Sequence, residues 1–175
     1  MANRRQSLKD LQERLAQRLT AARTEAATAS WLAVEAGGMR YLLPLVQSGE
    51  IFPWTAVQAV PYTKPWYVGV ANLRGGLNGV VDLAALVAGQ SSAADRITSE
   101  SRLVSLHGAL GVNAVLWIDR LLGLRNPSMF TSVAERPSDV PGYVTRILID
   151  PQGLSWQELD LQQLAGESEF LAIAA

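Results

Sequence analysis

The stretch GVANLRGGLNGVVDLAAL, residues 69–86, places two apolar runs on either side of a glycine pair. The first run ends in Asn72-Leu73-Arg74-Gly75-Gly76, and the second, Val80-Val81-Asp82-Leu83, follows at once. This order predicts a strand, a glycine turn and a second strand. Gly75 and Gly76 can adopt the positive φ angles that a tight connection needs, so we expect them to form the turn.

Two polar side chains, Asn72 and Arg74, lie where the first predicted strand runs into the turn. Polar groups held on a stiff scaffold are frequent binding residues. We expect Asn72 to be structural and to bond its own turn. Arg74 has two compatible interpretations: it ties the hairpin to a nearby carbonyl or carboxylate group, or it anchors a protein–protein interface.

The composition is that of an ordinary globular chain of 175 residues, 49% apolar and 18% charged, with a net charge of −1. This charge produces no overall field that attracts nucleic acid. The chain has no cysteine, which removes disulfides and thiolate metal sites. No apolar region of the kind found in a secretory signal follows the arginines near the N-terminus. No apolar run reaches the roughly 18 residues of a membrane span. We therefore expect a cytoplasmic protein without direct membrane insertion.

The first predicted element is a helix over residues 7–28, capped by Ser7. Its apolar stripe is Leu8, Leu11, Leu15 and Leu19. Residues 1–28 carry six basic and three acidic side chains, a net of +3, so the remaining chain carries about −4. We divide the chain into this N-terminal amphipathic helix, 1–28, and a domain over 29–175. The favoured interpretation docks the stripe on the chain's own domain. A partner-binding helix and a membrane-surface helix, which here lacks an aromatic anchor, are the alternatives.

The chain after residue 28 is predicted to form about ten short strands, in two sets on either side of a polar connector at 90–101. Strands of this number and length favour barrels or sandwiches. We expect the connector to be mobile. Asp82 is expected to cap a short helix that Gly89 ends. The tail after residue 167 keeps three apolar side chains and is expected to pack: Phe170, Leu171 and Ile173.

The sequence shows no catalytic or metal-binding constellation, and we predict no cofactor. The single histidine, His107, has no acidic or cysteine cluster beside it. The glycine hairpin lacks the Gly-Lys-Ser/Thr ending of a phosphate loop, and no Gly-x-Ser-x-Gly elbow is present. A hydrolase that uses His107 with Ser105 is the least favoured alternative.

The interface candidates are aromatic and charged residues near turns. Of five tryptophans, Trp54 and Trp66 each follow a proline in a predicted loop, so we expect them to be exposed and able to join a protein interface. Neither shows the basic interleaving of a nucleic-acid platform. Glu50 and Ile51 begin a predicted strand.

Residues 30–165 resemble the CheW-like domain family. The resemblance rests on Asn72-Leu73-Arg74-Gly75 followed by Val80-Val81-Asp82-Leu83, and on Glu50-Ile51, where the family often has Glu-Ile. It implies an all-β fold of two SH3-like, five-stranded antiparallel β-barrels. It also implies a non-enzymatic adaptor that joins the regulatory domain of a chemotaxis-type histidine kinase to the cytoplasmic tip of a chemoreceptor. An adaptor of this kind needs no catalytic group.

The predicted site follows from this resemblance. The partner-binding residues are Glu50, Ile51, Trp54, Trp66 and Arg74, and the structural motif is Asn72, Leu73, Gly75, Gly76 and Asp82. Asn78-Gly79 departs from the apolar residue and proline that usually precede the family's Val-Ile-Asp-Leu. With this departure and the two terminal extensions, the chain resembles the branch of the family that serves type IV pilus twitching motility, often called PilI. A generic SH3-like peptide-binding scaffold is the main alternative.

Overall fold

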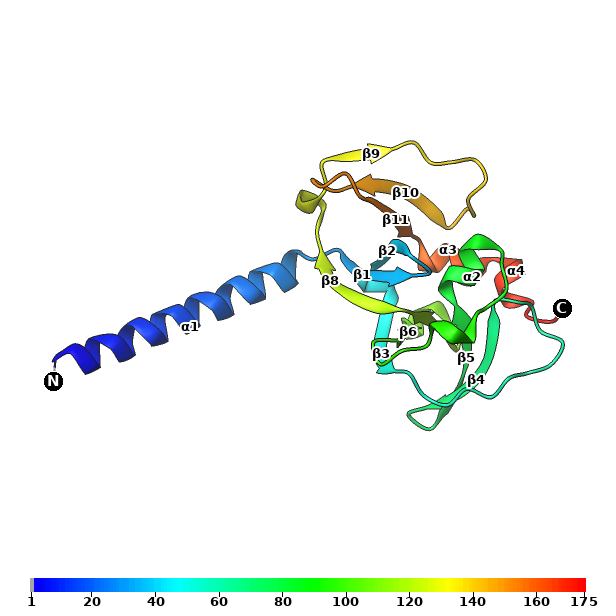
Figure 1. Cartoon of the computed structure of the whole chain (residues 1–175), viewed down its shortest axis with the longest axis horizontal. Coiled ribbons are helices and arrows are strands. Elements are labelled where there is room, and N and C mark those ends of the chain that lie inside the picture. Colours follow the sequence, from blue (N-terminus) through cyan, green and yellow to red (C-terminus); the bar gives the residue numbers. More distant parts are fainter. Residues whose placement is uncertain (1) are drawn as a thin grey trace.

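The computed structural model describes residues 2–175, with the side chains of 5–21, 29–93 and 95–175, and it is mainly β (Figure 1). The strands are β1 (Trp31–Ala36), β2 (Met39–Pro44), β3 (Ser48–Pro53), β4 (Tyr67–Leu73), β5 (Gly76–Asp82), β6 (Arg102–Leu106), β7 (Ala114–Ile118), β8 (Arg120–Arg125), β9 (Ser132–Ala134), β10 (Val144–Ile149) and β11 (Ser155–Leu159). The helices are α1 (Ala2–Thr28), α2 (Leu83–Ala88), α3 (Leu161–Gly166) and α4 (Ser168–Leu171), with short 3-10 turns η1 (Leu45–Gln47), η2 (Ala94–Arg96), η3 (Gly108–Leu110) and η4 (Pro127–Met129).

The strands form two sheets, which confirms the predicted fold class. One sheet has the order β8-β1-β2-β11-β10-β9, and the other β3-β6-β7-β5-β4. The sheets therefore have six and five strands, and each contains one parallel pair, β2 with β11 and β5 with β7. Strands lie on both sides of the connector 90–101, and each sheet takes strands from both sides of it.

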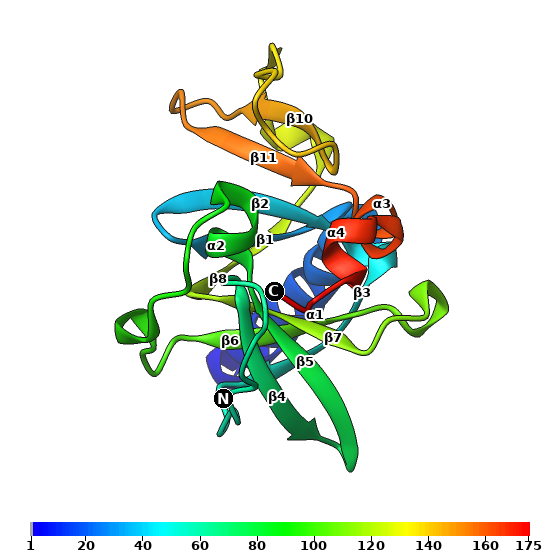
Figure 2. The ribbon, with the colours of Figure 1, turned by 90° about the vertical axis from the view of Figure 1, so that its right-hand side faces the viewer.

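Three apolar cores explain why β1 and β7 are buried along both faces. Successive side chains of a strand point to opposite faces. In β1, Trp31 and Ala33 enter the core of the six-stranded sheet, while Leu32 and Val34 enter a core shared by both sheets. In β7, Trp117 enters the core of the five-stranded sheet. Figure 2 shows α2, α3 and α4 in the shared layer between the sheets.

The central hairpin forms as predicted, from β4 and β5, with a shift of one residue in its turn. Leu73 pairs with Gly76, so the two turn residues are Arg74 and Gly75, with φ angles of +50° and +75°. Two successive positive φ angles are the signature of a type I′ turn. Gly76 is a strand residue instead. The predicted bond of Asn72 to its own turn is absent within residues 2–175, and Asn78 Nδ2 donates to Gly76 O over 3.2 Å.

The N-terminal helix α1 begins before its predicted start, so Ser7 lies inside the helix and does not cap it. Figure 1 shows α1 running away from the sheets. Its leucines are 50–61% exposed, so the prediction that the stripe docks on the chain's own domain is wrong. None of the helices in residues 2–175 combines the length and apolarity needed to cross a membrane.

The C-terminal tail packs on the body, as predicted. Its Phe170 is buried and stacks on Trp66, with ring centroids 5.8 Å apart and an interplanar angle of 12°. Residues 62–64 pair with residues 173–175 through backbone hydrogen bonds. The prediction of an exposed Trp66 is therefore wrong: the residue is 8% exposed, and Phe170 of the tail stacks on its ring.

Tyr41 of β2 makes the stability of the fold sensitive to high pH. Burial, assisted by the negative charge of Asp82, raises the pKa of Tyr41 to about 12. Above pH 10 the unfolded chain loses this proton while the folded chain keeps it, so the free energy of unfolding falls as pH rises from about 10 to 12. We expect a decrease of about 2–3 kcal/mol from this group, measured by urea denaturation across that range.

The matched variants are Tyr41→Phe, which should flatten this decrease, and Tyr62→Phe, which should not, because Tyr62 is 90% exposed. Burial also raises the pKa of Tyr143, so some decrease persists in every variant. An identical pH dependence in the wild type and Tyr41→Phe would contradict the assignment.

Candidate functional site

Glu50 and Arg74, predicted separately as partner-binding residues, form an ion pair on the surface. Arg74 Nε lies 2.8 Å from Glu50 Oε2, and the two side chains are 75% and 49% exposed. Exposed ion pairs contribute about 0–1 kcal/mol to stability, since water already solvates both charges. The pair is therefore better suited to hold two charges in a fixed position on the surface than to stabilise the fold.

A bulge in β3 presents Glu50. Ser48 pairs with Leu106 and Ile51 with Val104, which leaves one extra residue on β3. The Glu50 backbone N–H donates to Ser105 Oγ over 2.7 Å. At Gly49 an added Cβ would lie 2.3 Å from Ser105 Oγ and 3.0 Å from Leu106 O, so only glycine allows the two strands to approach this closely. Bulges of this kind redirect a side chain at a sheet edge.

The type I′ turn presents Arg74. Residues other than glycine, asparagine and aspartate rarely adopt positive φ, and a long side chain there costs roughly 1 kcal/mol. Asn-Gly is the preferred pair for such a turn. The chain therefore carries an arginine at a position where local backbone energetics favour asparagine. Strain of this kind at an exposed polar residue motivates a functional role for that residue.

The ion pair borders a surface hollow of about 330 Å³. The polar side chains of Glu50, Arg74 and Asn78 line it, together with Phe52 and the turn that follows β6. Ile51, the neighbour of Glu50, is 42% exposed. An exposed apolar side chain beside fixed charges is a common arrangement in protein interfaces.

The two predicted tryptophans do not join this site. Trp54 is half-buried, and its ring packs on Trp117 with a centroid distance of 5.0 Å. Trp66 lies under the C-terminal tail. Of the structural motif, Leu73 packs into the core of the five-stranded sheet, and Gly75 allows the turn.

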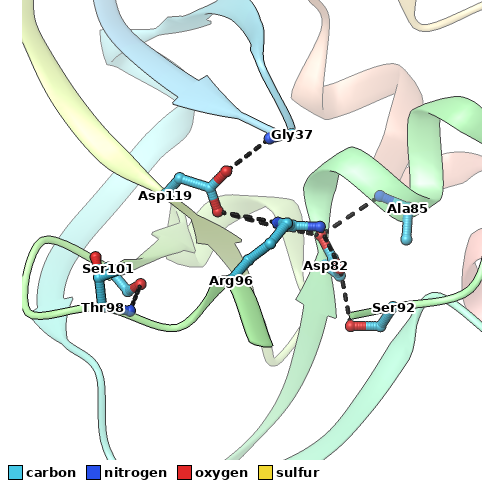
Figure 3. Close-up of polar contacts among 8 residues, drawn as sticks. All are labelled: Gly37, Asp82, Ala85, Ser92, Arg96, Thr98, Ser101 and Asp119. Carbon is cyan, nitrogen blue, oxygen red and sulfur yellow. Dashed lines mark hydrogen bonds and ion pairs between the residues drawn. The ribbon is translucent and has the colours of Figure 1, made fainter. Parts of the chain in front are cut away.

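Asp82 is buried and belongs to a polar cluster with the partly buried Arg96 and Asp119 (Figure 3). Its carboxylate caps α2 at Ala85 N–H and accepts two hydrogen bonds from the Arg96 guanidinium, at 2.9 and 3.1 Å. Arg96 also contacts Asp119 at 3.2 Å, and Asp119 accepts from Gly37 N–H over 2.7 Å. Because Gly37 lies in the β1–β2 turn, the cluster ties the two sheets together.

Arg96 is the residue that the sequence analysis missed, and it shows that the connector is anchored. Its guanidinium lies 4.6 Å from the centroid of the Trp117 ring. Burial alone lowers the pKa of Arg96, but the hydrogen bonds and charges of Asp82 and Asp119 raise it above its usual value. The two carboxylates are 14 and 23 residues away along the chain, so no local motif identifies them as partners.

Ser105 and His107, the pair required by the hydrolase alternative, have separate structural partners. Ser105 Oγ accepts the Glu50 N–H, and His107 Nδ1 accepts the Ala109 N–H over 3.1 Å. His107 therefore caps η3. Among the described residues, no group of three or more histidine, aspartate or glutamate side chains is placed to hold a metal ion.

Replacing Arg74 with asparagine should separate its role in the fold from its role at the surface. We expect Arg74→Asn to leave the free energy of unfolding unchanged or to raise it by up to about 1 kcal/mol, because asparagine tolerates positive φ. Arg74→Val should lower it, because a branched side chain does not. Urea denaturation measures both. A loss greater than about 1 kcal/mol in Arg74→Asn would show that the ion pair stabilises the fold.

A family model for the CheW-like domain matches residues 30–169. No curated protein matches the chain. Among solved structures, the chain is similar to the crystal structure of the scaffolding protein TtCheW from Thermoanaerobacter tengcongensis, with 17% sequence identity and a TM-score of 0.60. The similarity covers 76% of this chain and 89% of that one, which shows a shared fold. Glu50 and Arg74 lie inside the range matched by the family model, and α1 lies outside it.

Proposed function

Because this chain belongs to the CheW-like domain family, we propose that it is a non-enzymatic adaptor that couples a chemoreceptor to a chemotaxis-type histidine kinase in the cytoplasm. The observation that carries the proposal is the exposed Glu50–Arg74 ion pair at the surface hollow. Glu50 and Arg74 lie in two segments that resemble the family, Glu50-Ile51 and Asn72-Leu73-Arg74-Gly75. Control of type IV pilus twitching motility is the pathway we favour, from the departures at Asn78-Gly79 and at both ends of the chain.

An adaptor acts by holding its partners close together in a fixed arrangement. It binds two partners at once and raises the effective concentration of each for the other, without forming or breaking a covalent bond. The partners proposed are the regulatory domain of the kinase and the cytoplasmic tip of the receptor. Two sheets joined by a buried core and by the Arg96 cluster form a body stiff enough to hold them at a fixed separation.

Arg74 has hydrogen-bonding capacity left for a partner. Its Nε faces Glu50, while within residues 2–175 its two terminal nitrogens make no hydrogen bond. Those groups can donate to a carbonyl or carboxylate of a docking protein in the paired geometry that guanidinium favours. Glu50 holds the guanidinium in place before the partner arrives, which reduces the entropy lost on binding.

Calorimetric titration against the kinase regulatory domain and, separately, against a receptor-tip fragment tests the proposal. We expect saturable binding by the wild type, and at least tenfold weaker binding to one partner for Arg74→Asn and Arg74→Glu. The control is Arg146→Asn, since Arg146 is 50% exposed and also pairs with a glutamate, Glu158, at 2.7 Å, on the other sheet. That variant should bind like the wild type.

Three results would count against the proposal. Equal affinities for the wild type and both Arg74 variants would remove the site. Loss of the folded circular dichroism spectrum in Arg74→Asn would make Arg74 structural. A folded wild type that binds neither partner, with any such kinase of the cell, would favour a generic peptide-binding scaffold.

A further inference from the structure

The helix α1 carries an exposed leucine row that the proposed adaptor function does not use. Leu8, Leu11, Leu15 and Leu19 are 60%, 54%, 50% and 61% exposed. The helix has 27 residues, and Figure 1 shows it projecting from the sheets. Residues three and four apart share one face of a helix, so the four side chains form one continuous stripe. A stripe of this size in water indicates a surface for binding.

The spacing of the stripe fits a partner helix. The leucine intervals of three, four and four continue in the sequence with Ala22 and Ala26, so that positions 8, 11 and 15 repeat at 19, 22 and 26. This is an 11-residue repeat of about 3.67 residues per turn, which keeps the stripe on one side of a nearly straight helix. Over residues 8–19, where the side chains are described, the stripe is narrow and contains only leucine. Such a seam suits helix-to-helix packing, whereas membrane-surface helices have a wider apolar face with aromatic side chains.

The charges beside the stripe indicate what the partner carries. By helical spacing, Arg5 lies along one edge of the stripe, Arg14 and Arg18 lie along the other, and Asp10 and Glu13 lie on the opposite face. An antiparallel second copy of α1 would bring Arg14 and Arg18 against the same two arginines. A helix with acidic edges would bring opposite charges together instead.

We propose that α1 is a docking helix for another protein, and that its occupant is an amphipathic helix with an apolar seam flanked by acidic residues. Leucines pack into the seam and supply the affinity, while Arg5, Arg14 and Arg18 select the acidic partner. This proposal is independent of the Glu50–Arg74 site, because α1 lies outside the range of the family model.

The test uses the full chain and a synthetic helical peptide with leucines at the same spacing and glutamates along both edges. A second peptide carries lysines in place of the glutamates, and phosphatidylglycerol vesicles provide a membrane surface. We expect the full chain to bind the glutamate peptide, with affinity that falls as salt concentration rises. Binding to the lysine peptide should be at least tenfold weaker.

Variants of α1 identify the face used. Leu11→Ala with Leu15→Ala should weaken binding of the glutamate peptide roughly 100-fold or more, and alanine preserves the helix. Gln6→Ala with Gln17→Ala, on the opposite face, should bind like the wild type. Arg14→Glu with Arg18→Glu should reverse the preference between the two peptides.

Four outcomes would overturn the proposal. They are absence of binding to the glutamate peptide, equal binding to both peptides, tighter binding to the vesicles, and self-association of the full chain that the leucine variant abolishes. None of them bears on the titrations with kinase and receptor, so the two proposals fail separately.

Discussion

Replacing Arg96 with alanine is expected to lower the free energy of unfolding by about 3–5 kcal/mol. The Asp82 side chain is 0% exposed and Arg96 is its cationic partner. Removing Arg96 leaves a buried carboxylate without a counter-charge, and the desolvation cost of that charge is then no longer offset. The same change also removes the contact of the guanidinium with Trp117 and the bond to Asp119.

The matched control is Arg146→Ala. Arg146 also pairs with a glutamate, Glu158, but Arg146 is 50% exposed and Glu158 keeps a hydrogen bond from the Thr145 hydroxyl, so the loss of Arg146 should cost less than the loss of Arg96. Urea denaturation of both variants and the wild type measures the difference. A loss below about 1 kcal/mol for Arg96→Ala would show that the cluster is solvated and does not hold the sheets together.

The effects of Asp82→Asn and Arg96→Ala on the free energy of unfolding should be strongly non-additive. Once Arg96 is absent, the neutral amide removes the unpaired charge, so the double variant should be more stable than Arg96→Ala alone. A double variant that is less stable than either single one would mean that the two residues act independently.

Replacing Phe170 with alanine should have an effect of similar size, about 3–5 kcal/mol, because it removes a buried aromatic ring from the C-terminal tail. Phe170 is 4% exposed and stacks on Trp66. Without this ring the tail loses its main apolar anchor, and Trp66 becomes accessible to water. We therefore expect increased quenching of tryptophan fluorescence by iodide together with the loss of stability.

The adjacent Leu171 supplies the control, since it is 54% exposed and Leu171→Ala should leave both measurements close to the wild type. If Phe170→Ala and Leu171→Ala behaved alike, the tail would contribute little to the fold, and Trp66 would have to be protected by other residues.

Local signals in the sequence predicted the elements that depend on nearby residues. The β4–β5 hairpin follows from two apolar runs around glycines, and Asp82 and Gly89 cap α2 as their spacing predicts. The mainly β fold class follows from the number of short apolar runs. Each of these features depends on the conformational preferences of a few consecutive residues, which the sequence displays directly.

The candidate site was predicted residue by residue, but its geometry was not. Glu50 and Arg74 were both expected to bind a partner, yet nothing in the sequence indicated that they contact each other. Their contact depends on how the five-stranded sheet curves to bring β3 near the β4–β5 turn, and on the bulge at Gly49. The observed turn pair, Arg74 and Gly75, also lies one residue before the predicted pair, because the strand register pairs Leu73 with Gly76.

Several of the incorrect predictions concern side chains whose surroundings come from distant parts of the chain. Proline neighbours suggested an exposed Trp66, but Phe170 covers it. A serine-rich composition suggested a mobile connector, but Arg96 anchors it to Asp82 and Asp119. The leucine stripe of α1 is visible in the sequence, whereas its exposure is not. Periodicity and turn chemistry act over a few residues and are read from the chain itself, while burial and charge pairing arise only when the folded sheets bring remote residues together.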